Sequence, residues 1–367
     1  MTTMESSTSI SNELYTDIIR IQVTTVPSDS INTSIIGLQS PIVIFIWFEI
    51  IAACLVYGLG FIGNIFSLII FCSLDEFRRI STGCFFLLTT IANSFHLWTL
   101  TTEFLGVYNI YIYSGGFLQC RLNFFVQNVS RAMSTYLAIG IALDRFIRSE
   151  LPLRSRTICT RRNAIIYTIV NFIIFSILWS LWLCPTIIKD PITGKCIYNQ
   201  SPTFYFYLTQ VQTPVRFVIV LIIPVIIMIT ANIRMLQNMR QSHRRVAHQA
   251  EMNTTLTAVT PASMNKPIAR RMTSLDRMLF YMMVANIGTF IITQIPFHIY
   301  TLVRNYYAAL DPFTHSLVRA ILLIWSSIYF GIAFYLYCFA APIFRQKFIM
   351  ITQKFIGCLR HRPAREL

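Results

Sequence analysis

Apolar positions along this chain gather in long continuous runs. Seven runs of roughly 20 residues or more are long enough to cross the hydrocarbon core of a bilayer as helices. They cover residues 42–71, 83–105, 120–146, 162–185, 214–238, 277–303 and 317–341. An odd number of crossings places the two chain ends on opposite sides. We therefore predict an all-α membrane protein, a seven-transmembrane helix bundle over residues 42–341.

Composition and charge agree with this prediction and add an orientation. Apolar residues make up 55% of the chain and charged residues only 12%, whereas soluble domains carry about 25% charged residues. The net charge of +15 is unevenly distributed, because most of the 30 Lys and Arg residues fall in alternate loops and after residue 342. Cytoplasmic loops hold such an excess, so the amino terminus is predicted outside and the carboxyl terminus inside. Nothing beyond charge favours nucleic-acid binding.

The two ends of the chain differ from the bundle. Residues 1–41 are rich in Ser and Thr and lack a signal-peptide pattern, so a disordered extracellular tail is predicted, with Asn32 as a glycosylation acceptor. In the cytoplasmic segment 342–367, apolar residues three, four and seven apart predict an amphipathic helix in the membrane interface. Cys358 near its end is a candidate for palmitoylation, with a plain thiol as the alternative.

Two of the nine cysteines stand apart from the others. Only Cys120 and Cys196 fall at the predicted outer face. A disulfide between them would close a loop of about 77 residues and stabilise the fold by roughly 4 kcal/mol in the chain-entropy model. Two unpaired cysteines remain the alternative, although free thiols are disfavoured in an oxidising compartment.

Several short motifs stand at set distances from one another. Cys120 opens the third span and Asp144-Arg145-Phe146 closes it, so that the cysteine and Arg145 are 25 positions apart. Further marks are Gly63-Asn64, Pro224, Pro296, and Tyr337 followed by Pro342 and Phe344-Arg345. Over residues 42–357 this pattern resembles the rhodopsin-like (class A) family of G protein-coupled receptors. It is similar to divergent invertebrate receptors of the FMRFamide-type peptide and orphan groups.

The chain departs from this family's pattern at four places. Asn93 stands where the family's second-span Asp binds sodium, and Gln294 stands where a Trp is usual. Asn232 replaces a frequent Tyr, and Ala333-Phe334-Tyr335-Leu336-Tyr337 replaces Asn-Pro-x-x-Tyr. These changes leave the fold intact but put sodium modulation and the usual activation details in question.

The resemblance implies a plasma-membrane receptor that is not an enzyme and needs no cofactor. Its partners would be an extracellular ligand, a heterotrimeric G protein and the lipid bilayer. Asp144 and Arg145 are interpreted as a charged pair at the inner end of span three. Asp276 lies twenty residues before Pro296, about 30 Å along a helix, at the inner end of span six. The family's ionic lock implies an Arg145–Asp276 clamp, with Tyr337 in the same switch; Asp276 as a mere helix cap is the alternative.

Polar residues in the outer halves of the spans predict a ligand site. Gln127 and Arg131 share one face of span three, and an unpaired Arg131 would cost several kcal/mol in lipid. Glu103 is its candidate partner. The full candidate set is Glu103, Gln127, Arg131, Arg216, Gln294 and His298. Two arginines and one glutamate favour an acidic or carbonyl-rich ligand such as a neuropeptide, while an Arg131–Glu103 salt bridge that only braces the helices is the alternative.

Other protein classes are less well supported. A transporter or channel with a path through Arg131 and Glu103 is the main alternative, but no internal repeat is visible. A retinal pigment needs a lysine in span seven, and residues 317–341 contain none. His96 and His298 have no HExxH motif or acid-rich partner set, so no metal site is predicted.

Overall fold

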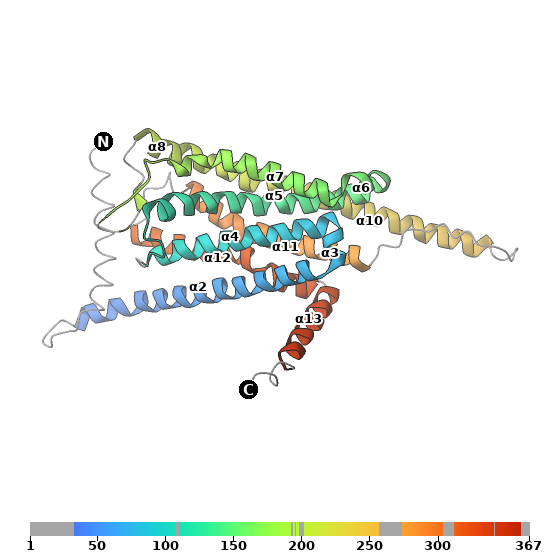
Figure 1. Cartoon of the computed structure of the whole chain (residues 1–367), viewed down its shortest axis with the longest axis horizontal. Helices are drawn as coiled ribbons and strands as arrows, with labels where there is room; N and C mark the ends of the chain where they lie inside the picture. Colours follow the sequence, from blue (N-terminus) through green and yellow to red (C-terminus); the bar gives the residue numbers. More distant parts are fainter. Residues whose placement is uncertain are drawn as a thin grey trace, which may run out of the picture.

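The computed structural model describes residues 33–107, 110–191, 194, 196–197, 202–256, 274–303, 312–340 and 342–360. Within these residues the chain is almost entirely helical, and the long helices run side by side along one axis (Figure 1). Asn32 and the rest of the predicted tail up to residue 32 lie outside the described residues.

Seven helical segments of the described chain form the bundle, and each overlaps one of the seven predicted apolar runs. They are α2 (Thr33–Ser73), α4 (Ser81–Val107), η1 (Phe117–Leu122) with α5 (Asn123–Glu150), α7 (Arg161–Leu178) with η2 (Ser180–Leu183), the continuous run α8 (Pro202–Phe206), η3 (Tyr207–Gln212), α9 (Thr213–Arg216), η4 (Phe217–Ile222) and α10 (Ile223–Leu256), then α11 (Ser274–Val303) and α12 (Pro312–Ala340). The connecting elements are α3 (Asp75–Arg79), α6 (Pro152–Ile158), β1 (Ile188–Lys189) and β2 (Cys196–Ile197), and α13 (Pro342–Arg360) follows the bundle.

Five of the described helical stretches are long and apolar enough to cross a membrane by length and composition: Ile44–Ser73, Arg161–Leu178, Gln210–Asn238, Phe280–Val303 and Leu317–Phe339. Helices α4 and α5, predicted as spans two and three, are too polar to be included. Several of their polar side chains, among them Asn93, His96 and Ser134, are at most 2% exposed because they face other helices of the bundle. A helix that meets other helices rather than lipid can carry such residues.

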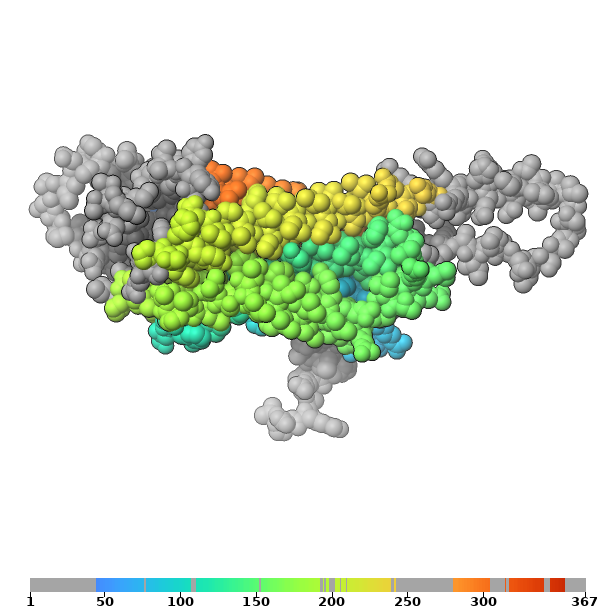
Figure 2. Space-filling model, turned by 90° about the horizontal axis from the view of Figure 1, so that it is seen from above, coloured from blue at the N-terminus to red at the C-terminus, as the bar shows by residue number. Residues whose placement is uncertain are grey.

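The outward faces of the bundle are apolar. Figure 2 shows one of them, formed by α7 and the helix that continues from α8 to α10. Exposed side chains here include Ile169, Phe172, Ile173, Ile226 and Ile233. An apolar surface of this extent suits contact with lipid rather than water.

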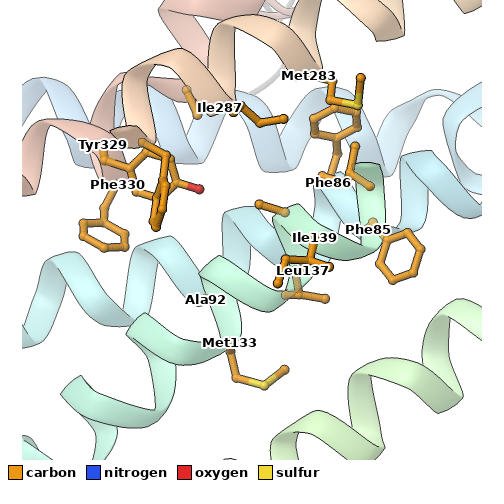
Figure 3. Close-up of a cluster of buried hydrophobic side chains, with 14 of the residues drawn as sticks. Phe85, Phe86, Ala92, Met133, Leu137, Ile139, Met283, Ile287, Tyr329 and Phe330 are labelled. Carbon is orange, nitrogen blue, oxygen red and sulfur yellow. The ribbon is translucent and has the colours of Figure 1, made fainter. Parts of the chain in front are cut away.

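The interior at the level of α4 and α5 is a continuous apolar core. The side chains labelled in Figure 3 come from α4, α5, α11 and α12, and α2, α7, η4 and α10 also contribute buried residues to this core. The labelled members include Phe85, Phe86, Leu137, Ile139, Met283, Ile287, Tyr329 and Phe330. This core holds the central helices together between the two polar regions described below.

Helices α2 and α12 approach each other closely at two glycines. A Cβ added at Gly331 would lie 2.7 Å from the Cα of Gly60, so neither position accepts a side chain without movement. Nearby, Nδ2 of Asn64 donates to the carbonyl of Phe330 at 3.1 Å. The Gly63-Asn64 pair therefore joins the first and last helices of the bundle.

Two prolines inside helices free backbone carbonyls that neighbouring side chains then bond. Pro296 has no N–H for the carbonyl of Ile292, and the indole of Trp325 on α12 donates to it at 3.2 Å. Pro224 follows the π-helical segment η4, where the hydroxyl of Tyr136 donates to the carbonyl of Ile219 at 3.3 Å. In a membrane interior such replacement bonds are needed for a broken ladder to be tolerated.

Helix α13 leaves the bundle at a steep angle to the other helices (Figure 1). Its Phe344 is fully buried, and Phe348 lies 5.1 Å from the ring of Phe334 and 5.2 Å from that of Phe66. Aromatic contacts with α2 and α12 thus set the direction of this helix.

Candidate functional site

One end of the bundle is covered by a disulfide-linked hairpin, and we call it the disulfide end. Cys120 and Cys196 are bonded, with their Cα atoms 5.5 Å apart, which confirms the predicted pair. Strands β1 and β2 pair antiparallel, with Lys189 opposite Cys196. Gly194 takes a positive φ of 70° in the turn, and its carbonyl accepts from Nε2 of Gln119 at 2.9 Å. The hairpin is therefore tied to the start of η1 and α5.

Cations near the hairpin are used to hold it in place. Arg121 donates to the carbonyls of Ile187 and Pro185 at 2.8 and 2.9 Å. The ammonium group of Lys189 lies 5.3 Å from the centroid of the Tyr111 ring and 3.3 Å from the carbonyl of Ser114. Both cations contact backbone carbonyls, and Lys189 also contacts the Tyr111 ring. They therefore hold the hairpin in its position over the bundle.

Below this cover, Arg131 of α5 is only 4% exposed. Its Nε donates to Nε2 of His96 on α4 at 3.3 Å, and its guanidinium carbon lies 5.1 Å from the ring centroid of Phe297 on α11. A histidine and an aromatic face stabilise the cation without neutralising it. Arg131 therefore lies inside the bundle without an ion pair among the described residues.

The Glu103 carboxylate, predicted as the partner of Arg131, acts on it through its charge but forms its ion pair with another arginine. Oε1 of Glu103 accepts from Nη2 of Arg319 on α12 at 2.8 Å, and Oε2 accepts from Nε2 of Gln127 at 2.5 Å. No ion pair joins Glu103 to Arg131 among the described residues. Gln127 lies one helical turn nearer the disulfide end than Arg131, so the carboxylate is reached by Gln127 first. The sequence analysis did not include Arg319 among the candidate site residues. Its presence as a cation in an otherwise apolar span could have indicated a role there.

Arg216 and His298 lie near Arg131, and within the described chain neither side chain has a hydrogen-bond partner. Arg216 belongs to the short α9 between the π-helical segments η3 and η4, and within the described chain it makes no hydrogen bond or ion pair. The charges of Arg131 and Arg216 both act on His298, and that of Arg216 acts on Arg131. His298 is 1% exposed, and neither ring nitrogen has a hydrogen-bond partner. We call Glu103, Gln127, Arg131, Arg216, His298 and Arg319 the arginine cluster.

Gln294 is placed apart from the arginine cluster. It is 1% exposed, and its Nε2 donates to the carbonyl of Ser326 on α12 at 2.8 Å. Gln294, at the position where the family that the sequence resembles usually has a Trp, thus forms a hydrogen bond between α11 and α12. Asn93, at the position of the usual sodium-binding Asp, accepts from the hydroxyl of Ser134 at 2.5 Å.

The opposite end of the bundle holds a second polar network, and we call it the Arg145 end. Asp144 accepts hydrogen bonds from the hydroxyls of Ser81 and Thr82 at the start of α4. Its ion pair is with Arg148, at 3.1 Å, and the charge of the neighbouring Arg145, the predicted partner, also acts on it. Arg145 donates from Nη2 to the hydroxyl of Thr82 at 2.6 Å. The hydroxyl of Thr82 therefore bridges Asp144 and Arg145, which are adjacent in sequence.

The loop after α5 completes this network. Arg148 also donates from Nη2 to Oγ of Ser81 at 2.8 Å and to the carbonyl of Cys159 at 3.1 Å. Burial, followed by the charge of Asp144, raises the pKa of the Cys159 thiol to about 12. The Asp144 carboxylate thus organises α4, α5 and the following loop at once.

Of the two remaining predicted switch residues, Asp276 and Tyr337, the structure describes the side chain of Tyr337 only. Asp276 lies in the first turn of α11, and its side chain is outside the described part of the chain, as is any Arg145–Asp276 contact. Tyr337 is 1% exposed, and its ring packs 5.2 Å from Phe86 and 5.8 Å from Phe344. Its ring therefore belongs to the aromatic contacts that join α4, α12 and α13.

The described His, Cys, Asp and Glu residues include no group of three that could hold a metal ion. A family model described as 7 transmembrane receptor (rhodopsin family) matches residues 63–343. No curated protein matches the chain. Because the family match covers most of the sequence, the chain belongs to the rhodopsin family of seven-transmembrane receptors. It is thus a multi-pass membrane receptor for signalling, of a family whose members are not enzymes.

Proposed function

We propose that this receptor binds an extracellular ligand, a neuropeptide, in the arginine cluster and then promotes nucleotide exchange on a heterotrimeric G protein. One observation carries the proposal. Helix α5 joins an unneutralised arginine at one end, Arg131, to the Asp144–Arg145 network at the other. A group bound near Arg131 therefore has a continuous helix through which to act on Arg145.

The proposed orientation puts the disulfide end outside the cell and the Arg145 end in the cytoplasm of a plasma-membrane receptor. Disulfides form in oxidising compartments, and the excess of Lys and Arg belongs on the inside. Helix α13 would then lie in the inner interface, with Phe344 and Phe348 anchoring it to the bundle. A lipid on Cys358 would add to that attachment.

The coupling step would release Arg145 from its bond to Thr82 and from a clamp with Asp276. Separation of the ends of α10 and α11 would then expose apolar surface bordered by cations such as Arg234. An amphipathic helix of the G protein α subunit, with an apolar face and acidic residues, suits such a groove. The receptor itself carries out no chemistry.

A peptide is supported by the donors in the arginine cluster. Each guanidinium has five N–H groups in a planar fork, which suits ligands rich in carbonyl and carboxylate oxygens. A monoamine has no such oxygens to offer, and the nearest acid, Glu103, is already bonded to Arg319 and Gln127.

The test measures G protein activation in cells by an energy-transfer sensor, with receptor numbers at the surface matched. Arg145→Ala is expected to abolish receptor-dependent activation, both basal and in response to a panel of short peptides. Arg79→Gln, which removes an exposed cation at the same end, is the control and should signal as the unchanged receptor does. Equal signalling by Arg145→Ala would overturn the mechanism. Ionic currents that depend on Arg131, with no G protein response, would support a transporter or channel instead.

A further inference from the structure

We infer that the ligand carries a carboxylate that binds between Arg131, Arg216 and His298. This inference rests on the proposed function and specifies the chemical class of its ligand. The features that support it are the charge balance of the arginine cluster, its unused hydrogen-bond donors, and its surroundings.

The charge balance leaves Arg131 and Arg216 without an ion pair among the described residues, although the charge of Glu103 acts on both. The arginine cluster contains three arginines and one glutamate, and that glutamate is engaged by Arg319 and Gln127. The buried Glu49 on α2 acts on Tyr57 and is not among the charges that act on either remaining arginine. Arg131 and Arg216 also repel each other. One bound anion would remove this repulsion and neutralise part of the excess charge.

The unused donors point to the same place. Arg131 bonds through Nε alone, Arg216 has no hydrogen bond within the described chain, and both ring nitrogens of His298 are unpartnered although the side chain is 1% exposed. A neutral imidazole still offers one N–H. Buried polar groups in folded proteins are nearly always satisfied, so each exception calls for an explanation. A carboxylate is well suited to accept hydrogen bonds from two guanidinium groups and one imidazole.

The environment of Arg131 and His298 favours a ligand group with one negative charge over a group with two. Arg131 packs on the ring of Phe297, and His298 is enclosed by the bundle. Desolvation costs rise steeply with charge, so a dianion such as phosphate is harder to bring to this depth than a carboxylate. Arg216 also stands between two π-helical segments, a geometry often found at functional sites.

The first experiment measures thermal unfolding of the purified receptor in nanodiscs of zwitterionic lipid at constant ionic strength. The probes are acetate, benzoate and N-acetylphenylalanine, each compared with its neutral amide, and inorganic phosphate. At concentrations far above the dissociation constant, a carboxylate should raise the melting temperature by about 4 °C. The amides should have no effect. Arg131→Gln and Arg216→Gln should remove the shift, and Arg79→Gln should keep it.

The second measurement needs no probe and separates ligand binding from helix bracing. If Arg216 awaits an anion, Arg216→Gln should melt at the same or a higher temperature than the unchanged receptor, because a repulsive charge is lost. If Arg216 only braces the helices, the variant should melt lower, and the inference fails. Carboxylates that act no better than their amides, or a shift with phosphate alone, would also overturn it.

A third arm distinguishes a small carboxylic acid from a peptide. Peptides are compared as free acids and as C-terminal amides in the G protein assay. Activation by free acids supports a peptide source, whereas activation by N-acetylphenylalanine or benzoate alone supports a small acid. A carboxylate-specific shift without any G protein response would retain the inference and contradict the proposed function.

Discussion

The two polar regions along α5 differ in how their charges are satisfied. At the Arg145 end, Asp144 accepts from two hydroxyls and pairs with Arg148, and Arg145 donates to Thr82. In the arginine cluster, by contrast, Arg131 packs on a ring and bonds a histidine, and Arg216 makes no hydrogen bond or ion pair in the described chain. A network with its own ion pair stabilises one conformation, whereas cations without an ion pair gain stability when a ligand supplies an acid. The difference suggests a switch at one end and a binding site at the other.

The largest effect is expected from breaking the cover over the arginine cluster. Cys120→Ser opens a loop closed between residues 76 apart in sequence, and the chain-entropy model assigns such a crosslink about 4 kcal/mol of unfolding free energy. Thermal unfolding and surface expression measure the loss. Cys184→Ser removes a free thiol and should change little; an equal loss in both variants would show that the effect is not due to the crosslink.

A slightly smaller effect is expected from the centre of the Arg145 network. Thr82→Val removes a hydroxyl that donates to Asp144 and accepts from Arg145, and leaves both charges short of a partner. Bonds to buried charges make the expected loss about 3 kcal/mol, measured as the melting temperature in nanodiscs.

Two variants on the same helix control for this change. Thr82→Ser keeps the hydroxyl and should retain most of the stability. Thr89→Val is also buried, but its hydroxyl bonds only the carbonyl of Phe85 in its own helix. If Thr89→Val costs as much as Thr82→Val, the charged network is not the reason for the loss.

A modest effect is expected from the one ion pair in the arginine cluster. Arg319 is 51% exposed, so solvent screens its pair with Glu103, and Arg319→Gln should cost about 1 kcal/mol or less. Glu103→Gln should cost more, because it leaves three arginines without any acid. Unfolding of the two variants and their double mutant gives the coupling energy. A smaller cost for Glu103→Gln than for Arg319→Gln would argue against uncompensated positive charge.

The smallest effect concerns a single thiol. Because burial and Asp144 raise the pKa of Cys159 to about 12, little thiolate exists near neutral pH and alkylation by iodoacetamide should be slow. The rate should rise as the pH approaches that value. Asp144→Asn removes a negative charge, lowers the pKa and should accelerate the reaction. Mass spectrometry of the Cys159 peptide measures both, and a rate independent of Asp144 would contradict the proximity of the two groups.

Sequence patterns predicted the architecture well where lipid imposes a simple rule. The seven apolar runs each overlap a helical segment, since a span must be long and apolar to cross a bilayer. The disulfide followed from the separation of two cysteines from the other seven. The polar α4 and α5 were also found, although by composition they fall short of the five apolar spans.

The partners of the charged side chains in the arginine cluster and at the Arg145 end were predicted less well. Glu103 was assigned to Arg131 but bonds Arg319, which lies more than two hundred positions along the chain. Asp144 was assigned to its neighbour Arg145 but pairs with Arg148, one turn further along α5. Adjacent residues point in different directions on a helix, whereas residues four apart share a face. Which distant helix supplies a partner depends on packing that no local pattern records.

The residue pattern was enough to predict that this chain is a membrane bundle, which residue types its spans bury, and that cations occur where lipid would penalise them. Those properties depend on composition and spacing alone. Which charges form ion pairs depends on the packing of the helices, because an ion pair requires two side chains within a few ångströms of each other. By bringing Arg319 to Glu103, the fold leaves Arg131 and Arg216 without an ion pair among the described residues and creates the proposed site for a carboxylate.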